Sequence, residues 1–189
     1  MKKKIAIIGA GISGLTFANF LKKNSDYDFV VYEKKDSLDL TEGYGIQLST
    51  NSVNILNQIG FNDLKLEHKF YPGKVDFYSL NNTKKICDLD ITQFNSENTN
   101  YTTIKRSLFL KFLKEKLFSN SIIFRKKINE IEQIDGKINI HFIDGSSDEV
   151  DFLVVSDGVF SNTKSVIEKK IFKPSYYGAI AVRTQITTQ

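Results

Sequence analysis

The stretch Ile5-Ala6-Ile7-Ile8-Gly9-Ala10-Gly11-Ile12-Ser13-Gly14 decides the fold. Its first four residues are apolar and mostly β-branched, which is typical of a parallel strand buried on both faces. Apolar residues then recur at helical spacing as far as Leu21, and a second apolar run covers residues 29–32. A strand, a helix and a strand within 33 residues predict a right-handed crossover with the two strands parallel in one sheet.

The glycines between the first strand and the helix follow the pattern G-x-G-x-x-G. In this context Gly9 permits a tight turn, and Gly11 lets the backbone approach a pyrophosphate. Gly14 lets the helix pack closely on the strand. The alternative is that these glycines serve packing alone, which is a common outcome for isolated matches to the pattern.

The start of the helix and the end of the second strand supply the polar groups that a dinucleotide needs. The first helical N–H groups, at Ile12 and Ser13, have no partner within a helix and face the phosphates with the positive end of the helix dipole. Glu33 follows the second strand, nineteen residues after Gly14, where it can accept hydrogen bonds from a ribose diol. These features predict an adenine dinucleotide as ligand, and the carboxylate disfavours a 2′-phosphate.

Composition and charge narrow the function further. The chain has 189 residues, of which 41% are hydrophobic and 25% charged, so it has the composition of a globular protein. The net charge is +4, but only three of the basic residues are arginines and the lysines are scattered, which argues against nucleic acid as a partner. The single cysteine, Cys87, and the glycine-interrupted N-terminal run favour a cytoplasmic protein over a secreted one. Neither His68 nor His141 has a metal-ligand spacing to a second donor, so we expect no metal site. Apart from the interrupted N-terminal run, no stretch approaches the roughly 18 apolar residues needed to span a bilayer, so we expect no integral membrane segment.

Beyond the first 33 residues the pattern is mixed. Thr50 is the expected cap of a helix that ends near Gly60, and two Asp-Gly turns, at 135–136 and 144–145, predict antiparallel strands. We expect the apolar run at 150–155 to return to the parallel sheet as one strand. The other expected elements are a hairpin of residues 75–79 and 84–88, a helix at 107–118, strands at 121–125, 128–134 and 137–143, a helix at 162–169, and one or two strands within 176–186.

Four segments together resemble the FAD-dependent aromatic hydroxylases of the p-hydroxybenzoate hydroxylase type, which include the ubiquinone-biosynthesis hydroxylases. Besides the glycine pattern with Tyr32-Glu33-Lys34, the segment 43–51 is similar to the family's G-x-G-I-x-L-x-x-N-A motif. Arg106 opens a segment like R-x-x-L-x-x-x-L, and residues 151–158 resemble D-x-L-V-x-A-D-G, with Ser156 where the family usually has alanine. The family's fold implies a Rossmann-like α/β FAD-binding domain with a parallel sheet and an antiparallel β-meander, plus the beginning of a β-rich substrate domain.

The resemblance also implies cofactors, site residues and domain boundaries. It implies that the chain binds FAD and that the enzyme uses NAD(P)H as electron donor and O₂ to hydroxylate a small aromatic substrate. In such enzymes the cofactor, and not a protein side chain, performs the redox chemistry. The resemblance also adds four residues to the expected cofactor-binding residues: Lys34, Gly45, Arg106 and Asp157. The implied FAD-binding domain is 1–70 with 91–170, and 71–90 with 171–189 form part of a substrate domain.

The match covers only about the first half of the family's pattern, without its later G-D motif. Three interpretations therefore remain open from the sequence. The chain is a monooxygenase completed by a second chain that supplies the C-terminal half, a truncated and non-catalytic fragment, or an NAD-dependent dehydrogenase domain.

Overall fold

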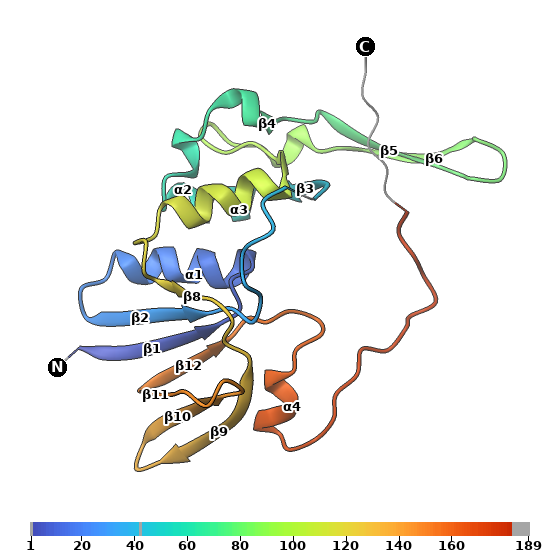
Figure 1. Ribbon diagram of the computed structural model, residues 1–189. Helices are drawn as coiled ribbons and strands as arrows, with labels where there is room; N and C mark the ends of the chain where they lie inside the picture. The colour runs from blue at the N-terminus through green and yellow to red at the C-terminus, as the bar shows by residue number, and fades with distance from the viewer. Residues whose placement is uncertain (1, 42, 183–189) are drawn as a thin grey trace. The chain divides into compact units, whose positions relative to one another are not determined.

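The computed structural model describes residues 2–41 and 43–182 (Figure 1). These residues pack as two compact units. The first unit contains the chain up to Leu40 and again from Leu110, and the second contains Thr41–Phe109. The domain boundaries expected from the family resemblance concern function and stay a prediction.

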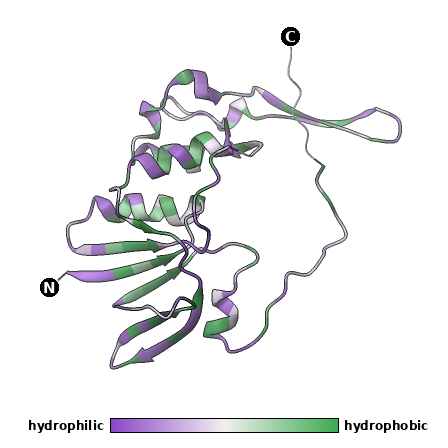
Figure 2. Ribbon diagram, viewed as in Figure 1, coloured by the Kyte–Doolittle hydropathy of each residue, from purple (hydrophilic) through white to green (hydrophobic). Residues whose placement is uncertain are grey.

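A four-stranded parallel sheet forms the centre of the first unit. Its strands lie in the order β12-β1-β2-β8, and helix α1 makes the crossover from β1 to β2 as predicted. Residues 5–8 of β1 are at most 5% exposed, which explains why this part of the strand is apolar. Figure 2 shows β1 and β2 changing from hydrophilic to hydrophobic toward their carboxyl ends. The elements are β1 (Lys3–Ile8), α1 (Ile12–Lys22), β2 (Tyr27–Tyr32), β8 (Ile122–Ile123) and β12 (Phe152–Val155).

One buried polar side chain joins α1 to helix α3 (Arg106–Glu115). Asn19 is 4% exposed, and its amide donates to the carbonyl of Leu15 at 2.8 Å and to that of Leu113 at 2.9 Å. Both amide hydrogens therefore have acceptors, which offsets the cost of burying the group. Leu110, Leu113 and Leu117 are buried, as the helical pattern predicted.

An antiparallel meander follows, made of β9 (Ile128–Ile134), β10 (Lys137–Phe142) and β11 (Ser147–Val150). Asp135 and Gly136, which join the first two strands, have φ values of 50° and 77°, as a type I′ hairpin turn requires. The apolar face of the meander packs on the parallel sheet in one core cluster, where the rings of Tyr32 and Phe142 lie 4.6 Å apart.

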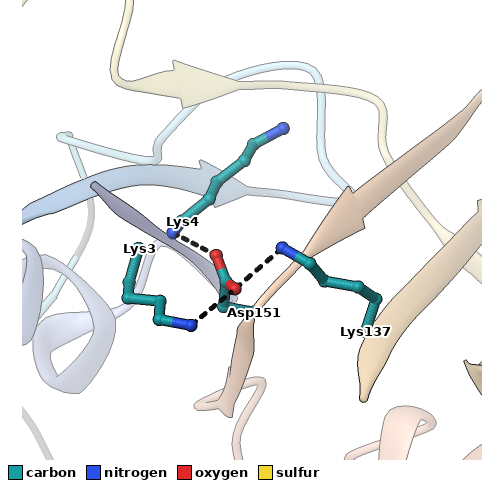
Figure 3. A network of polar contacts seen from close by, with 4 residues as sticks. All are labelled: Lys3, Lys4, Lys137 and Asp151. Carbon is teal, nitrogen blue, oxygen red and sulfur yellow. Dashed lines mark hydrogen bonds and ion pairs between the residues drawn. The ribbon is translucent and has the colours of Figure 1, made fainter. Parts of the chain in front are cut away.

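The run 150–155, expected as a single strand, is divided between two sheets. Val150 ends the meander and Phe152 begins β12, and the break lies at Asp151. Its carboxylate accepts hydrogen bonds from the Lys4 backbone N–H and the Lys137 ammonium, both at 2.8 Å, with Lys3 at 3.4 Å (Figure 3). These contacts, with the Lys137 ammonium first, hold the pKa of Asp151 well below its ordinary value. The strand is interrupted because this charged side chain is bound where the chain passes from one sheet to the other.

Between β12 and residue 182 the chain contains one short helix, α4 (Thr163–Ile167), which is shorter than the predicted 162–169. Residues 171–182 form no strand, so the expected strand over 176–186 is wrong as far as 182, and its remainder lies outside the described residues. Tyr177 is 97% exposed, and without a partner strand an apolar segment has no ladder to join.

The second unit holds a small antiparallel sheet in the order β3-β7-β4, which we did not predict. The predicted hairpin is confirmed as β5 paired with β6. Helix α2 has Ser49 rather than Thr50 as its N-cap. The elements are β3 (Gly45–Leu48), α2 (Thr50–Asn57), η1 (Phe61–Asp63), η2 (Leu66–His68), β4 (Lys69–Phe70), β5 (Lys74–Tyr78), β6 (Lys85–Asp90), η3 (Thr92–Phe94) and β7 (Thr102–Lys105).

The core of this unit is built around two aromatic rings. Phe61 and Phe109 are almost fully buried and meet edge to face, with centroids 5.7 Å apart. Val53, Leu56 and Ile104 are also buried. Across the described residues of both units, the helices are too short or too polar to cross a membrane.

Candidate functional site

The glycine turn between β1 and α1 is too crowded for side chains at two of its three glycines. Gly9 has φ +102°, and a Cβ there would lie 2.6 Å from the carbonyl oxygen of Ser156. A Cβ on Gly14 would lie 2.0 Å from the carbonyl oxygen of Gly9. The turn therefore brings β1, α1 and the end of β12 into backbone contact, which accounts for the glycines expected to serve the turn and the packing.

Gly11 differs from the other two glycines because nothing crowds it. Among the described residues, no atom beyond its neighbours lies within 4 Å of an added Cβ, and its φ of −80° is one that any residue adopts. Packing within the chain therefore does not require glycine at this position. A close approach by a ligand does require it, and this is the observation that fits a pyrophosphate at the turn.

The first turn of α1 presents its backbone N–H groups next to Gly11. The first helical hydrogen bond runs from the Leu15 N–H to the Gly11 carbonyl at 2.9 Å, and no side chain within residues 2–41 or 43–182 caps the helix. The N–H groups of Ile12, Ser13 and Gly14 precede that bond, and Ser13 is exposed. Together with the helix dipole they form a site for an anion.

Glu33 lies at the carboxyl end of β2 and contacts the same turn. One carboxylate oxygen accepts from the Ala10 N–H at 2.9 Å, and the other accepts from the Lys35 N–H at 2.9 Å. A carboxylate has about four acceptor positions, so each oxygen can still accept a ribose hydroxyl. Glu33 is half-buried, whereas Lys34 is exposed, and the role expected of Lys34 stays a prediction.

Asp157 follows β12, on the other side of β1. One oxygen, Oδ2, accepts from the hydroxyl of Thr163 at 2.8 Å and from its backbone N–H at 3.2 Å. The other oxygen, Oδ1, is buried and has no hydrogen-bond partner in the part of the chain that the structure describes. The residue lines a cavity of about 290 Å³. The other lining residues are Val155, Gly158, Ser161, Lys164, Ile167 and Glu168.

Ser156, which we noted only as a departure from the family's pattern, joins the two strand ends. Its hydroxyl donates to the carbonyl of Ile8 at 2.8 Å and is 3.3 Å from that of Gly9. Alanine could not make either bond. The substitution of serine for the family's alanine was the sequence signal for this contact, but the partners are backbone atoms and leave no trace in the sequence.

Gly45 and Arg106 belong to the second unit. Gly45 pairs with Lys105 in the sheet of β3 and β7. The N–H of Arg106 donates to the carbonyl of Tyr44 at 3.1 Å, and a Cβ on Gly43, whose φ is +132°, would lie 2.9 Å from the Cβ of Arg106. Within this unit, Gly43 therefore leaves the room that the Arg106 side chain occupies, and the flavin-binding roles of Gly45 and Arg106 stay predictions.

Comparisons with known proteins agree with this geometry. A family model described as an NAD(P)-binding Rossmann-like domain matches residues 7–39. The FAD-dependent monooxygenase anuJ of Penicillium roqueforti is 31% identical, over 89% of this chain and 22% of its own length. The 6-hydroxynicotinate 3-monooxygenase of Bordetella bronchiseptica is 26% identical, over 99% of this chain and 49% of its own length. The chain thus spans half or less of the length of these relatives.

Solved structures show the same fold. The 2,6-dihydroxypyridine-3-hydroxylase from Arthrobacter nicotinovorans superposes with a TM-score of 0.75 at 19% identity, over 94% of this chain and 42% of that chain. HpxO of Klebsiella pneumoniae, solved with FAD and uric acid, has a TM-score of 0.71 at 24% identity, over 86% of this chain and 41% of that chain. The chain is therefore a Rossmann-like α/β protein that resembles the N-terminal half of the FAD-dependent monooxygenases of the aromatic-hydroxylase type.

Proposed function

We propose that the chain binds FAD and forms the nucleotide-binding part of a flavin-dependent monooxygenase. The observation that carries the proposal is the open space at Gly11 beside the uncapped start of α1. Its support from outside the chain is the similarity to FAD-dependent monooxygenases.

Each group of the site has a part in holding the dinucleotide. The N–H groups of Ile12, Ser13 and Gly14 would hold the pyrophosphate, and Glu33 would accept from the ribose hydroxyls. Asp157 has an acceptor oxygen free for a further hydroxyl of the ligand. Arg106, Lys34 and Gly45 are proposed as further contacts on the basis of the family resemblance.

When bound, FAD supplies the redox chemistry, in which a hydride from NAD(P)H is used with O₂ to hydroxylate the substrate. The residues of this chain bind and orient the cofactor. We propose a small aromatic substrate, since relatives bear names such as 6-hydroxynicotinate 3-monooxygenase and 3-amino-4-hydroxybenzoate 2-monooxygenase. Completion by a second chain and a cytoplasmic location also belong to this proposal, the latter supported by the free thiol of Cys87.

A second candidate is a nicotinamide-dependent dehydrogenase domain. The match of residues 7–39 to an NAD(P)-binding Rossmann-like domain favours it. That stretch contains the glycine turn and Glu33, which both dinucleotides use through the ADP half that they share. The two candidates therefore differ only in the half of the ligand that residues outside 7–39 would contact.

Titration of the purified chain with FAD, followed by flavin fluorescence quenching, tests the proposal. We expect saturable FAD binding that ADP displaces and that is tighter than binding of NADH. In Gly11→Ala the added methyl group meets the pyrophosphate and FAD affinity falls. Gly73→Ala is the matched control, because an added Cβ there meets only the Thr92 methyl group at an ordinary 3.9 Å. Binding of NADH without FAD would replace the monooxygenase proposal with the dehydrogenase.

A further inference from the structure

We propose that Thr163 is a positioning residue, which fixes the Asp157 carboxylate so that Oδ1 is free to accept a hydroxyl group of the bound nucleotide. This inference rests on the proposed FAD binding. It assigns a role to a residue that neither the glycine pattern nor the resemblance singled out.

Thr163 makes two hydrogen bonds to the same carboxylate oxygen. Its hydroxyl lies 2.8 Å and its backbone nitrogen 3.2 Å from Oδ2 of Asp157. Thr163 is itself only 2% exposed, so it does not exchange this contact for water. Two donors on one oxygen hold the carboxylate against rotation about its terminal torsion, which is otherwise broad and soft.

The consequence is seen at the other oxygen. Oδ1 of Asp157 is buried and has no partner among residues 2–41 and 43–182, although an unpaired buried acceptor is costly. A carboxylate that rotated freely would share its donors between its two oxygens. Because both donors of Thr163 bind Oδ2, Oδ1 is the oxygen that is left without a donor.

The place of Asp157 indicates the kind of group that meets this requirement. A Cβ on Gly9 would lie 2.9 Å from the Asp157 Cα, so Asp157 is in backbone contact with the turn proposed to bind the pyrophosphate. Phosphate oxygens are acceptors and repel a carboxylate, whereas ribose and ribityl hydroxyls can donate to it. A hydroxyl group of the dinucleotide is therefore the partner that fits Oδ1.

A purely structural role for Thr163 predicts something different. Thr163 begins α4, and its contact with Asp157 could simply stabilise the start of that short helix. In that case loss of the hydroxyl lowers stability and leaves FAD affinity unchanged in the folded protein. Only the positioning role couples Thr163 to the ligand through Asp157.

The test compares FAD dissociation constants and urea unfolding for the native chain and three single variants, and it adds a double-mutant cycle. Thr163→Val removes the hydroxyl at nearly constant volume, and Thr163→Ser retains it. Ser165→Ala is the matched control. It removes a hydroxyl from the same helix, but this hydroxyl accepts from the Phe172 N–H and does not contact Asp157. The cycle adds Thr163→Val to Asp157→Ala.

We expect Thr163→Val to weaken FAD binding about tenfold, as loss of one hydrogen bond to a charged group does. Thr163→Ser should restore affinity, Ser165→Ala should match the native chain, and in the Asp157→Ala background Thr163→Val should have no further effect. Native-like FAD affinity in folded Thr163→Val, or an equal loss in the Asp157→Ala background, would overturn the positioning role and leave the proposed function standing. Absence of FAD binding by the native chain would refute the proposed function itself, and the inference with it.

Discussion

Gly11 and Gly14 belong to the same turn, yet alanine should impair different properties at the two positions. At Gly14 an added Cβ would lie 2.0 Å from the Gly9 carbonyl oxygen and 2.7 Å from the Ser156 hydroxyl oxygen. At Gly11 an added Cβ would meet no atom of the other described residues within 4 Å. We therefore predict that Gly14→Ala mainly destabilises the fold, whereas Gly11→Ala mainly weakens ligand binding.

The sizes of the two effects follow from these contacts. The Gly9 oxygen is a backbone atom between a strand and a helix, so α1 must move by about an ångström to make room for a Cβ on Gly14. Overpacking of this kind costs about 3 kcal/mol or more. At Gly11, alanine loses about 0.5–1 kcal/mol as a poorer N-cap and regains about as much from the lower entropy of the unfolded chain. The free energy of unfolding of Gly11→Ala should thus stay within about 1 kcal/mol of the native value.

Urea unfolding followed by circular dichroism, together with FAD titration of the folded proteins, measures both effects. Gly14→Ala should unfold at a clearly lower urea concentration than the native chain. Gly11→Ala should unfold at the same urea concentration as the native chain but bind FAD more weakly. If Gly14→Ala is as stable as the native chain, the close approach of α1 to β1 is wrong. If Gly11→Ala binds FAD normally, the pyrophosphate does not lie at this turn.

Three further predictions concern side chains around the site and the meander. Ser156→Ala should lower the free energy of unfolding by about 0.5–1.5 kcal/mol in urea titrations, because the bond to the Ile8 carbonyl is lost. Glu33→Ala should weaken FAD binding by about 1–3 kcal/mol in fluorescence titrations, since ribose hydroxyls lose their acceptor. The pKa of Asp144 is lowered from 3.8 to about 2, mainly by the Lys126 ammonium and next by the Ser146 hydroxyl. The ionised Asp144 carboxylate therefore stabilises the folded chain above pH 3.8, and that stability is lost as the pH falls toward 2. Asp144→Asn should therefore flatten the fall in unfolding free energy measured between pH 4 and pH 2, and an unchanged slope would contradict the Lys126 pairing.

The parts of the fold that could be predicted from the sequence are those with a local cause. The apolar run before Gly9, the helical spacing after it and the turn at Asp135-Gly136 each depend on residues within one element. The structure has these elements where the pattern placed them. The parallel return of β12 to β1 could also be predicted from its apolar run, although β12 lies at the edge of the sheet and its Phe152 and Val155 are exposed.

The parts that could not be predicted depend on partners distant in the sequence. β3 is four residues long and pairs with β7, more than fifty residues later, so neither strand has a period long enough to detect. The break at Asp151 depends on Lys4 and Lys137. The contact of Thr163 with Asp157 is the exception in distance, since it joins residues six apart, and it depends on the short helix that begins at Thr163. In each case the deciding interaction is a hydrogen bond between segments that carry no common pattern.

The site also explains why the glycine pattern alone does not identify the dinucleotide. The groups proposed to bind the shared ADP half are the N–H groups at the start of α1 and the carboxylate of Glu33, and all of them lie within residues 7–39. FAD and NAD both present a pyrophosphate and an adenosine ribose to such groups. Discrimination must therefore come from residues that contact the other half of the ligand. In the first unit, Asp157 is the site residue outside 7–39 that we predicted from the sequence, and Thr163 fixes its carboxylate. The preference of the native chain for FAD over NADH should accordingly shrink in Asp157→Ala while its affinity for ADP stays the same, whereas an equal loss for all three ligands would place Asp157 at the shared half.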